Sequence, residues 1–241
     1  LQARGHIYDE ETGRMIVRPF DKIFNLGENK TKPKTKGPYF VQLKMNGFLG
    51  VVTKYKDGII YSTTGSTTSD FAKYVQREIE KIPGLKESFW EGFTYLFEIC
   101  IPEDPHIIPE KHGVYLLCRR HISTGICYPF PPELQKFKLN VPYYIMSNIE
   151  DLHKAQNVEG YVIWEPHIYH PTLKIKTTDY LVRKFIARGN AEKKAKIFDD
   201  QVNKFKVFDD EEMVPYVEYI RNNFTKEQFM NMSEQEILQA L

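Results

Sequence analysis

The sequence is poor in cysteine and contains no long apolar run. Its three cysteines, Cys100, Cys118 and Cys127, are odd in number and follow no metal-ligand spacing, so they indicate neither a disulfide framework nor a zinc site. No apolar run reaches the length that spans a membrane, and the first residues lack an apolar signal-peptide core. We therefore expect a reducing compartment and no membrane partner.

The chain also lacks an excess of charge of either sign. It carries 33 Lys and Arg against 32 Asp and Glu, a net charge of +1, so any contact with nucleic acid must come from local patches. In one patch, lysines occupy every second position of a segment that contains proline and glycine: Lys30, Lys32, Lys34 and Lys36. A second crowds a predicted helix: Arg183, Lys184, Arg188, Lys193, Lys194 and Lys196. A solvated face is the alternative for both, and we favour the second for phosphate contact because it follows the Lys174-Lys176 strand directly.

Strand signals fill the chain to about residue 180. Helical spacing appears between Ser69 and Pro83, where Ser69-Asp70 is a candidate cap for the helix start, and, more briefly, over residues 150–156. After Gly189 the pattern is helical, with Pro215 at a helix start and a capping box from Ser233 to Glu236. We expect an α+β protein built on antiparallel sheets over residues 1–189, followed by a small helical C-terminal appendage over residues 190–241.

The most informative stretch is Lys44-Met45-Asn46-Gly47, which joins an alternating extended run to the apolar run 48–52. A lysine beside a glycine can approach a phosphate closely, because glycine adds no side chain. Lys44 is therefore a candidate nucleophile. The alternative is a solvated hairpin lysine.

Three later apolar strands are interrupted by charge. They carry Glu98, Glu159 and the pair Lys174 and Lys176. Strand interiors do not normally admit unpaired charges on the side that faces the core. The alternative for the lysine pair, two residues apart, is the wet face of an antiparallel strand.

In this order the four elements resemble the nucleotidyltransferase motifs of ATP-dependent polynucleotide ligases. The resemblance covers roughly residues 1–190 and is nearest to the phage-type tRNA-repair RNA ligases and the adenylyltransferase domain of fungal tRNA ligase. Residues 3–5, 18–25 and 156–160 are similar to that RNA-ligase branch, whereas residues 109–116 and Asn46 look more like the fungal enzymes. The resemblance implies two antiparallel sheets with ATP in the groove between them.

The implied reaction begins when Lys44 attacks the α-phosphorus of ATP and forms lysyl-AMP. The AMP then passes to an RNA 5′-phosphate and is displaced by a 3′-hydroxyl. Only a neutral amine can attack, so we expect Lys174, Lys176 and a bound metal to lower the pKa of Lys44 while they stabilise the phosphoryl charge.

The resemblance also assigns the nucleotide site. Glu98 holds the ribose, Glu159 binds Mg²⁺, and Gly160 leaves room beside the nucleotide. The other assigned contacts are Arg4, Lys22, Phe24 (to adenine, with plain core as the alternative), Asn46 and Gly47. One departure concerns Thr64, which stands where the phage enzymes carry a phosphate-binding lysine; weaker triphosphate affinity or help from Lys73 are the alternatives. A second is that only three residues precede Arg4-Gly5.

The partners implied are the ends of a broken tRNA or another RNA, with Arg183, Lys184 and Arg188 as phosphate contacts. The chain lacks a G-x-x-x-x-G-K-[ST] loop, so we expect end-healing kinase and phosphatase activities on separate proteins. The expected location is the cytoplasm, the host cytoplasm for a viral protein, or the nucleus for a fungal one.

Two other functions stay open. His121-Ile122-Ser123 and His170-Pro171-Thr172 match the paired motif of two-histidine phosphoesterases, which use histidines as acid and base. A catalytically inactive RNA- or nucleotide-binding relic of the ligase fold is the second alternative. The intact lysines and glutamates argue against it.

Overall fold

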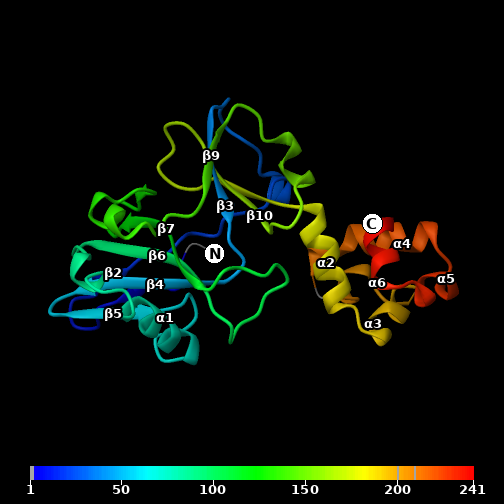
Figure 1. Ribbon diagram of the computed structural model, residues 1–241, viewed down its shortest axis with the longest axis horizontal. Helices are drawn as coiled ribbons and strands as arrows, with labels where there is room; N and C mark the ends of the chain where they lie inside the picture. Colours follow the sequence, from blue (N-terminus) through cyan, green and yellow to red (C-terminus); the bar gives the residue numbers. More distant parts are fainter. Residues whose placement is uncertain (1–2, 200, 209) are drawn as a thin grey trace.

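The computed structural model describes residues 3–199, 201–208 and 210–241. Strands dominate up to Lys176 and helices follow, gathered at one end of the molecule (Figure 1). This confirms the predicted α+β class with antiparallel sheets and a helical C-terminal part. Within the described ranges, no helix is long and apolar enough to cross a membrane.

Two antiparallel sheets build the strand-rich part. The five-stranded sheet has the order β5-β4-β6-β7-β8, with β4 at Phe48–Tyr55, β5 at Gly58–Ser62, β6 at Phe93–Cys100, β7 at Gly113–His121 and β8 at Cys127–Tyr128. The four-stranded sheet has the order β11-β10-β3-β9, with β3 at Tyr39–Lys44, β9 at Tyr143–Met146, β10 at Gly160–Trp164 and β11 at Leu173–Lys176. A separate hairpin joins β1 (Ile7–Tyr8) to β2 (Met15–Val17).

Helix α1 (Asp70–Glu80) covers one face of the five-stranded sheet. Ser69 caps it by accepting a hydrogen bond from the Ala72 amide, as the sequence predicts. Its apolar stripe places Val75 and Ile79 in the core of that sheet, both fully buried. A second apolar cluster, which includes Val51, Leu96 and Trp164, joins residues of both sheets and fixes them to each other.

The chain crosses from one sheet to the other between Lys44 and Phe48. Lys44 ends β3, and Phe48 begins β4. A Cβ at Gly47 would collide with the Ile99 carbonyl and lie 2.9 Å from the Cys100 sulfur, so the crossing requires glycine there. The predicted strand-turn-strand is confirmed, and its turn joins two different sheets.

The helical part begins at α2 (Thr178–Arg188) and continues through α3 (Ala191–Lys196), α4 (Val214–Asn223), α5 (Lys226–Asn231) and α6 (Glu234–Ala240). Phe185 of α2 packs in the same core as Val217 and Ile237, and Asp179 of α2 accepts a hydrogen bond from the Asn157 main-chain amide, so α2 contacts both parts of the molecule. The division of the chain after residue 189 remains a prediction. The capping box from Ser233 to Glu236 is confirmed.

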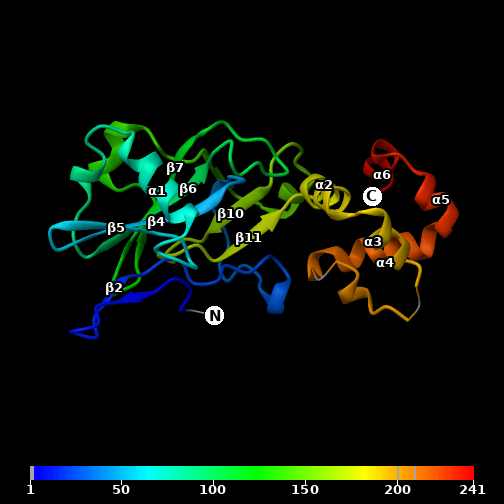
Figure 2. The same ribbon diagram turned by 90° about the horizontal axis from the view of Figure 1, so that it is seen from below.

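Short 3-10 helices fill the connections: η1 Glu28–Lys30, η2 Lys86–Ser88, η3 Pro132–Phe137, η4 Glu150–Lys154, η5 Lys204–Lys206 and η6 Glu211–Met213. The helix expected over residues 150–156 is η4. From below, the segment between β2 and β3 runs along β11 (Figure 2). The Leu26 amide donates to the Lys174 carbonyl at 2.8 Å, and the Lys174 amide donates to the Phe24 carbonyl at 2.9 Å.

Candidate active site

A cavity of about 280 Å³ lies between the two sheets. Four of the predicted site residues line it: Arg4, Lys44, Glu98 and Lys174. They come from the N-terminal segment, β3, β6 and β11, so the fold brings together residues that are far apart in the sequence. The cavity lies at the crossing between the sheets, where the resemblance expects the nucleotide, and we call it the nucleotide cavity.

Lys44 is held by a carboxylate. Its Nζ lies 2.8 Å from Oε2 of Glu159, which is 4% exposed. The Asn46 side-chain amide donates to the same oxygen at 2.8 Å. In the four-stranded sheet Gly160 is the register partner of both Lys44 and Lys176, so the two lysines flank one glycine.

The structure corrects the expected lowering of the Lys44 pKa. Burial lowers that pKa, but Glu159 and Glu98 outweigh burial and raise it above its ordinary value. It is Lys174 whose pKa is lowered: burial lowers it most, and repulsion from Lys176 and Lys44 lowers it further. With no ligand present, Lys44 is therefore a charged amine, and it must be released from Glu159 before it can attack.

Glu98 is 9% exposed and accepts a hydrogen bond from the Gly47 amide at 3.1 Å. Burial raises the pKa of Glu98 to about 7, against the opposing effect of Lys44. This carboxyl group lies on the wall of the cavity that Lys174 of β11 also lines. It is placed to accept hydrogen bonds from ligand hydroxyl groups.

Sequence reasoning missed the loop that covers Asn46. The Asn46 side-chain oxygen accepts a hydrogen bond from the Ile108 main-chain amide at 3.1 Å. The main-chain amide of Asn46 donates to Glu110 Oε1 at 3.1 Å. An aspartate at position 46 could not also donate to Glu159, so the amide type matters here. The fungal-type stretch 109–116 was the sequence signal that pointed to this loop.

A further missed residue is Glu212, which comes from the helical part. Its carboxylate lies 2.8 Å from Lys176 Nζ and 2.7 Å from Lys184 Nζ, and it accepts from the Asn25 side chain at 3.0 Å. These contacts lower the pKa of Glu212 to about 2, against the opposing effect of burial. The acidic run that precedes Met213, opposite in charge to the basic helix, was the available signal.

The basic helix is consequently not the free surface that the sequence favoured. Lys184 is 6% exposed and pairs with Asp210 and Glu212, so its assignment as an RNA contact is corrected. Arg188 pairs with Asp210 at 2.9 Å and Arg183 with Asp179 at 3.0 Å.

Lys22 and Phe24 lie outside the nucleotide cavity. Both line a neighbouring cavity of about 280 Å³, where Lys22 pairs with Glu28 at 2.7 Å and lies over the Phe24 ring at 4.6 Å. Their nucleotide contacts remain predictions. Thr64 does line the nucleotide cavity, whereas Lys73 pairs with Asp70 on the exposed side of α1 and does not replace the missing lysine.

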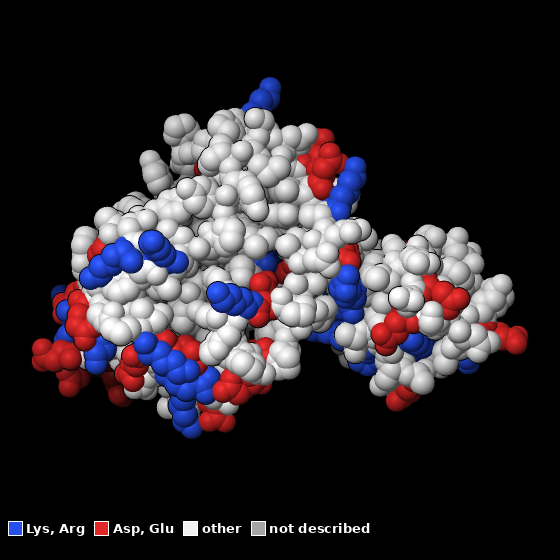
Figure 3. Space-filling view, in the orientation of Figure 1, with Lys and Arg blue, Asp and Glu red and all other residues white. Residues whose placement is uncertain are grey.

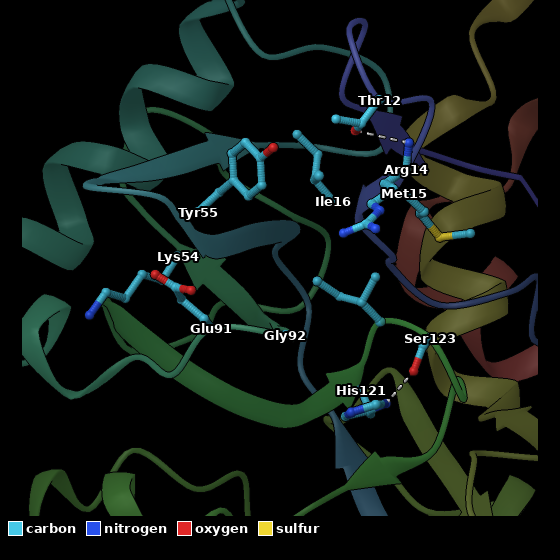
Figure 4. Close-up of a pocket in the computed structure, with 11 residues that line it drawn as sticks. Thr12, Arg14, Met15, Ile16, Lys54, Tyr55, Glu91, Gly92, His121 and Ser123 are labelled. Carbon is cyan, nitrogen blue, oxygen red and sulfur yellow. Dashed lines mark hydrogen bonds between the residues drawn. The ribbon is translucent and has the colours of Figure 1, made fainter.

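The two-histidine hypothesis fails on geometry. His121 lines a cavity of about 360 Å³ beside Ser123 and Arg14 (Figure 4). His170 lines the cavity that contains Lys22 and Phe24. An acid and a base that act on one phosphate must share one site, and these two residues do not.

The carboxylates fit a divalent ion that is held mainly by substrate. Among the described residues, no group of three or more His, Cys, Asp or Glu side chains could enclose a metal. Mg²⁺, however, is usually bound by one or two carboxylates plus phosphate oxygens and water. Glu159 fits that requirement, because the contacts from Lys44 and Asn46 both go to Oε2 and leave Oε1 available.

Comparisons with known proteins agree with this geometry. RNA ligase 1 of bacteriophage TS2126 is 30% identical over 190 residues, covering 67% of this chain and 47% of that protein. tRNA ligase 1 of Schizosaccharomyces pombe is 24% identical over 179 residues, covering 61% of this chain and 23% of that protein. The chain thus spans about half the length of the phage relative and less of the yeast one.

Solved structures show the same fold. An archaeal ATP-dependent RNA ligase superposes with a TM-score of 0.57 at 15% identity, covering 95% of this chain and 64% of its own. A Naegleria gruberi RNA ligase mutant with ATP and Mn superposes with a TM-score of 0.50 at 16% identity, covering 68% of this chain and 57% of its own. A family model described as RNA ligase matches residues 2–181, and the chain therefore belongs to the RNA ligase family.

Proposed function

We propose that this protein is an ATP-dependent RNA ligase that joins a 5′-phosphate to a 3′-hydroxyl through a lysyl-AMP intermediate. The observation that carries the proposal is the placement of Lys44 at the crossing between the sheets, on one cavity with Glu98 and Lys174 and in contact with Glu159. An inactive relic has no need to keep these charges arranged around one lysine. Ligation therefore fits the site better than passive binding.

In the first step the Lys44 nitrogen loses a proton and bonds to the α-phosphorus of ATP. The bond from that phosphorus to the β-phosphate oxygen breaks, and pyrophosphate leaves. Lys174 stabilises the charge on the phosphoryl group from the wall of the cavity. The RNA 5′-phosphate then displaces Lys44 from AMP, and the 3′-hydroxyl of the other end displaces AMP.

The proposed metal is Mg²⁺, held by Glu159 and by substrate phosphates. Bound there, it would supply positive charge that offsets Glu159 and the departing pyrophosphate. Asn46 keeps Glu159 in place through its 2.8 Å contact. Glu98 binds the ribose hydroxyls.

The proposed substrates are the ends of a broken tRNA. One relative is a phage RNA ligase and another is a yeast tRNA ligase, and these names support that choice. Separate kinase and phosphatase enzymes would prepare the ends. The proposed location is the cytoplasm, whether of the cell or of a phage host, with the nucleus as the fungal alternative.

The test is incubation of the protein with α-labelled ATP and magnesium, followed by denaturing electrophoresis. We expect label fixed to the protein from ATP and far less from GTP. Lys44→Arg should abolish the label, because a guanidinium stays charged and cannot attack phosphorus. Label retained on Lys44→Arg would overturn the assignment, and equal labelling by GTP would favour a capping-type guanylyltransferase.

A further inference from the structure

The lysine loop, residues 30–36, carries four cations. Lys30, Lys32, Lys34 and Lys36 are all exposed. In the part of the chain that the structure describes, none of their side chains forms an ion pair. The basic helix α2 differs, since Lys184 and Arg188 are neutralised by carboxylates. Elsewhere acidic and basic side chains are interspersed, as on the face shown in Figure 3.

The backbone of this loop is held in place by contacts that use none of its lysine side chains. Glu165, 4% exposed, accepts hydrogen bonds from the Lys34 amide at 2.6 Å, the Thr35 amide at 2.7 Å and the Thr35 hydroxyl at 3.0 Å. The Tyr39 hydroxyl donates to the Thr35 carbonyl at 2.8 Å. A buried carboxylate that binds two main-chain amides orders the loop without using any lysine side chain.

The loop opens onto the neighbouring cavity of about 280 Å³. Lys34 lines this cavity together with Asp21, Lys22, Arg120 and His170. Lys22 pairs with Glu28 and Arg120 with Asp21, so among the described residues Lys34 is the cation of this cavity without a carboxylate partner. Burial, followed by the nearby Lys34 and Arg120, lowers the pKa of His170, which agrees with a positive potential there. The unpaired charge of Lys34 therefore makes the cavity suitable for an anion such as a phosphate group.

This basic cavity adjoins the nucleotide cavity. The two share Phe20, Asp21 and Ile23 as a common wall. The exposed Tyr169, next to His170 in the chain, adds an aromatic ring of the kind on which unpaired bases stack. Consecutive phosphates on one strand could occupy the loop and the basic cavity while the end of that strand reaches Lys44.

Building on the proposed ligase function, we propose that the lysine loop and the adjoining basic cavity bind the phosphodiester backbone of the RNA strand whose end enters the nucleotide cavity. The contact is electrostatic, so it depends on salt and is indifferent to base sequence. It acts after lysyl-AMP has formed, because the residues that line the cavity with Lys44 include none of the loop. Loss of the loop charges therefore separates RNA binding from adenylation.

The test compares Lys32→Ala/Lys34→Ala with wild type. Both substitutions keep the main-chain amides that Glu165 holds, so the loop should keep its path. Fluorescence anisotropy with a short 5′-phosphorylated single-stranded RNA, labelled at its 3′ end, gives affinity against salt concentration. We expect binding weaker by about tenfold and a salt slope reduced by about 1.4, since each phosphate contact on a single strand contributes about 0.7. Lysyl-AMP formation without RNA should be unchanged.

The matched control is Lys86→Ala/Lys226→Ala, which removes two exposed lysines from η2 and α5. It should bind RNA as wild type does. Equal RNA binding and salt slope in wild type and in the loop variant would overturn the proposal, as would a raised ATP requirement with unchanged RNA binding. If wild type takes no label from ATP but binds RNA through the loop, the proposed function fails while this surface stands.

Discussion

At the scale of single residues, the contact between Lys44 and Glu159 controls when Lys44 is free to attack ATP in the proposed reaction. The two charges are 2.8 Å apart in a largely buried site, and Asn46 shares the same carboxylate oxygen. A buried pair of this kind is costly to break by removing one partner, because the other charge is then left unpaired. Nucleotide and metal binding must therefore supply the interactions that free the amine.

Glu98 gives a prediction about pH. Because its pKa is raised from 4.5 to about 7, the folded protein holds a proton that the unfolded chain has released, and stability falls as pH rises between these values. Glu98→Gln removes this dependence. The free energy of unfolding of wild type should fall by at most about 3 kcal/mol relative to the variant across that window. Urea denaturation at both ends of the window measures it, and parallel pH curves would contradict the raised pKa.

Lys174 gives a prediction about rate. Lys174→Ala should slow lysyl-AMP formation at saturating ATP about a hundredfold, or about 3 kcal/mol, because a cation on the cavity wall is lost where phosphoryl charge develops. Single-turnover labelling measures the rate, and Lys73→Ala, on the exposed side of α1, serves as control. Adenylation at the unmutated rate would mean that Lys174 is only the wet face of a strand.

At the scale of elements, local chemistry was readable from the sequence and pairing between strands was not. Ser69 and Ser233 cap helices as predicted, because a cap is set by residues three positions apart. The Thr177 cap of α2 is an equally local signal, but the packing of α2 was not readable, because its partner Val217 lies far along the chain. The strand order β11-β10-β3-β9 depends on long-range pairing that no local pattern encodes.

Gly160 tests the pairing of β10 with β11. A Cβ there would collide with the Ile175 carbonyl and lie 2.8 Å from the Lys176 Cα, so Gly160→Ala should push these strands apart. We expect a loss of about 1–3 kcal/mol in unfolding free energy together with lost adenylation. Gly58→Ala is the control, because its Cβ would make only an ordinary contact at 3.8 Å. Thermal denaturation with labelling decides, and an unaffected Gly160→Ala protein would refute the close approach.

At the scale of the whole molecule, Glu212 ties the helical part to the strands. It binds Lys176, 36 positions earlier in the chain, and Asn25, 187 positions earlier, while Lys184 holds it from α2. The sequence shows the opposite charges but not their meeting, because that depends on how the helices fold back. Lys176 is consequently neutralised in the free protein.

The pH response of this contact can be predicted. The pKa of Glu212 is lowered from 4.5 to about 2, so its stabilisation is present above pH 4.5 and is lost as pH falls through the lower value. Glu212→Gln should cost at most about 3 kcal/mol near neutral pH, and the difference should disappear in acid. Denaturation followed by circular dichroism measures this, with the exposed Glu10→Gln as control. A constant difference at every pH would argue against the ion pairs.

The anchoring of the lysine loop through Glu165 bears on how such a surface can diverge. Its hydrogen bonds reach main-chain amides and the Thr35 hydroxyl, and none depends on a lysine side chain. The side chains of Lys32 and Lys34 can therefore be exchanged without loss of these contacts, whereas the φ of 60° at Lys30 restricts the choice of residue there. The charge of the loop can therefore be changed by mutation or by design, while Lys44 and the two sheets around it stay as they are.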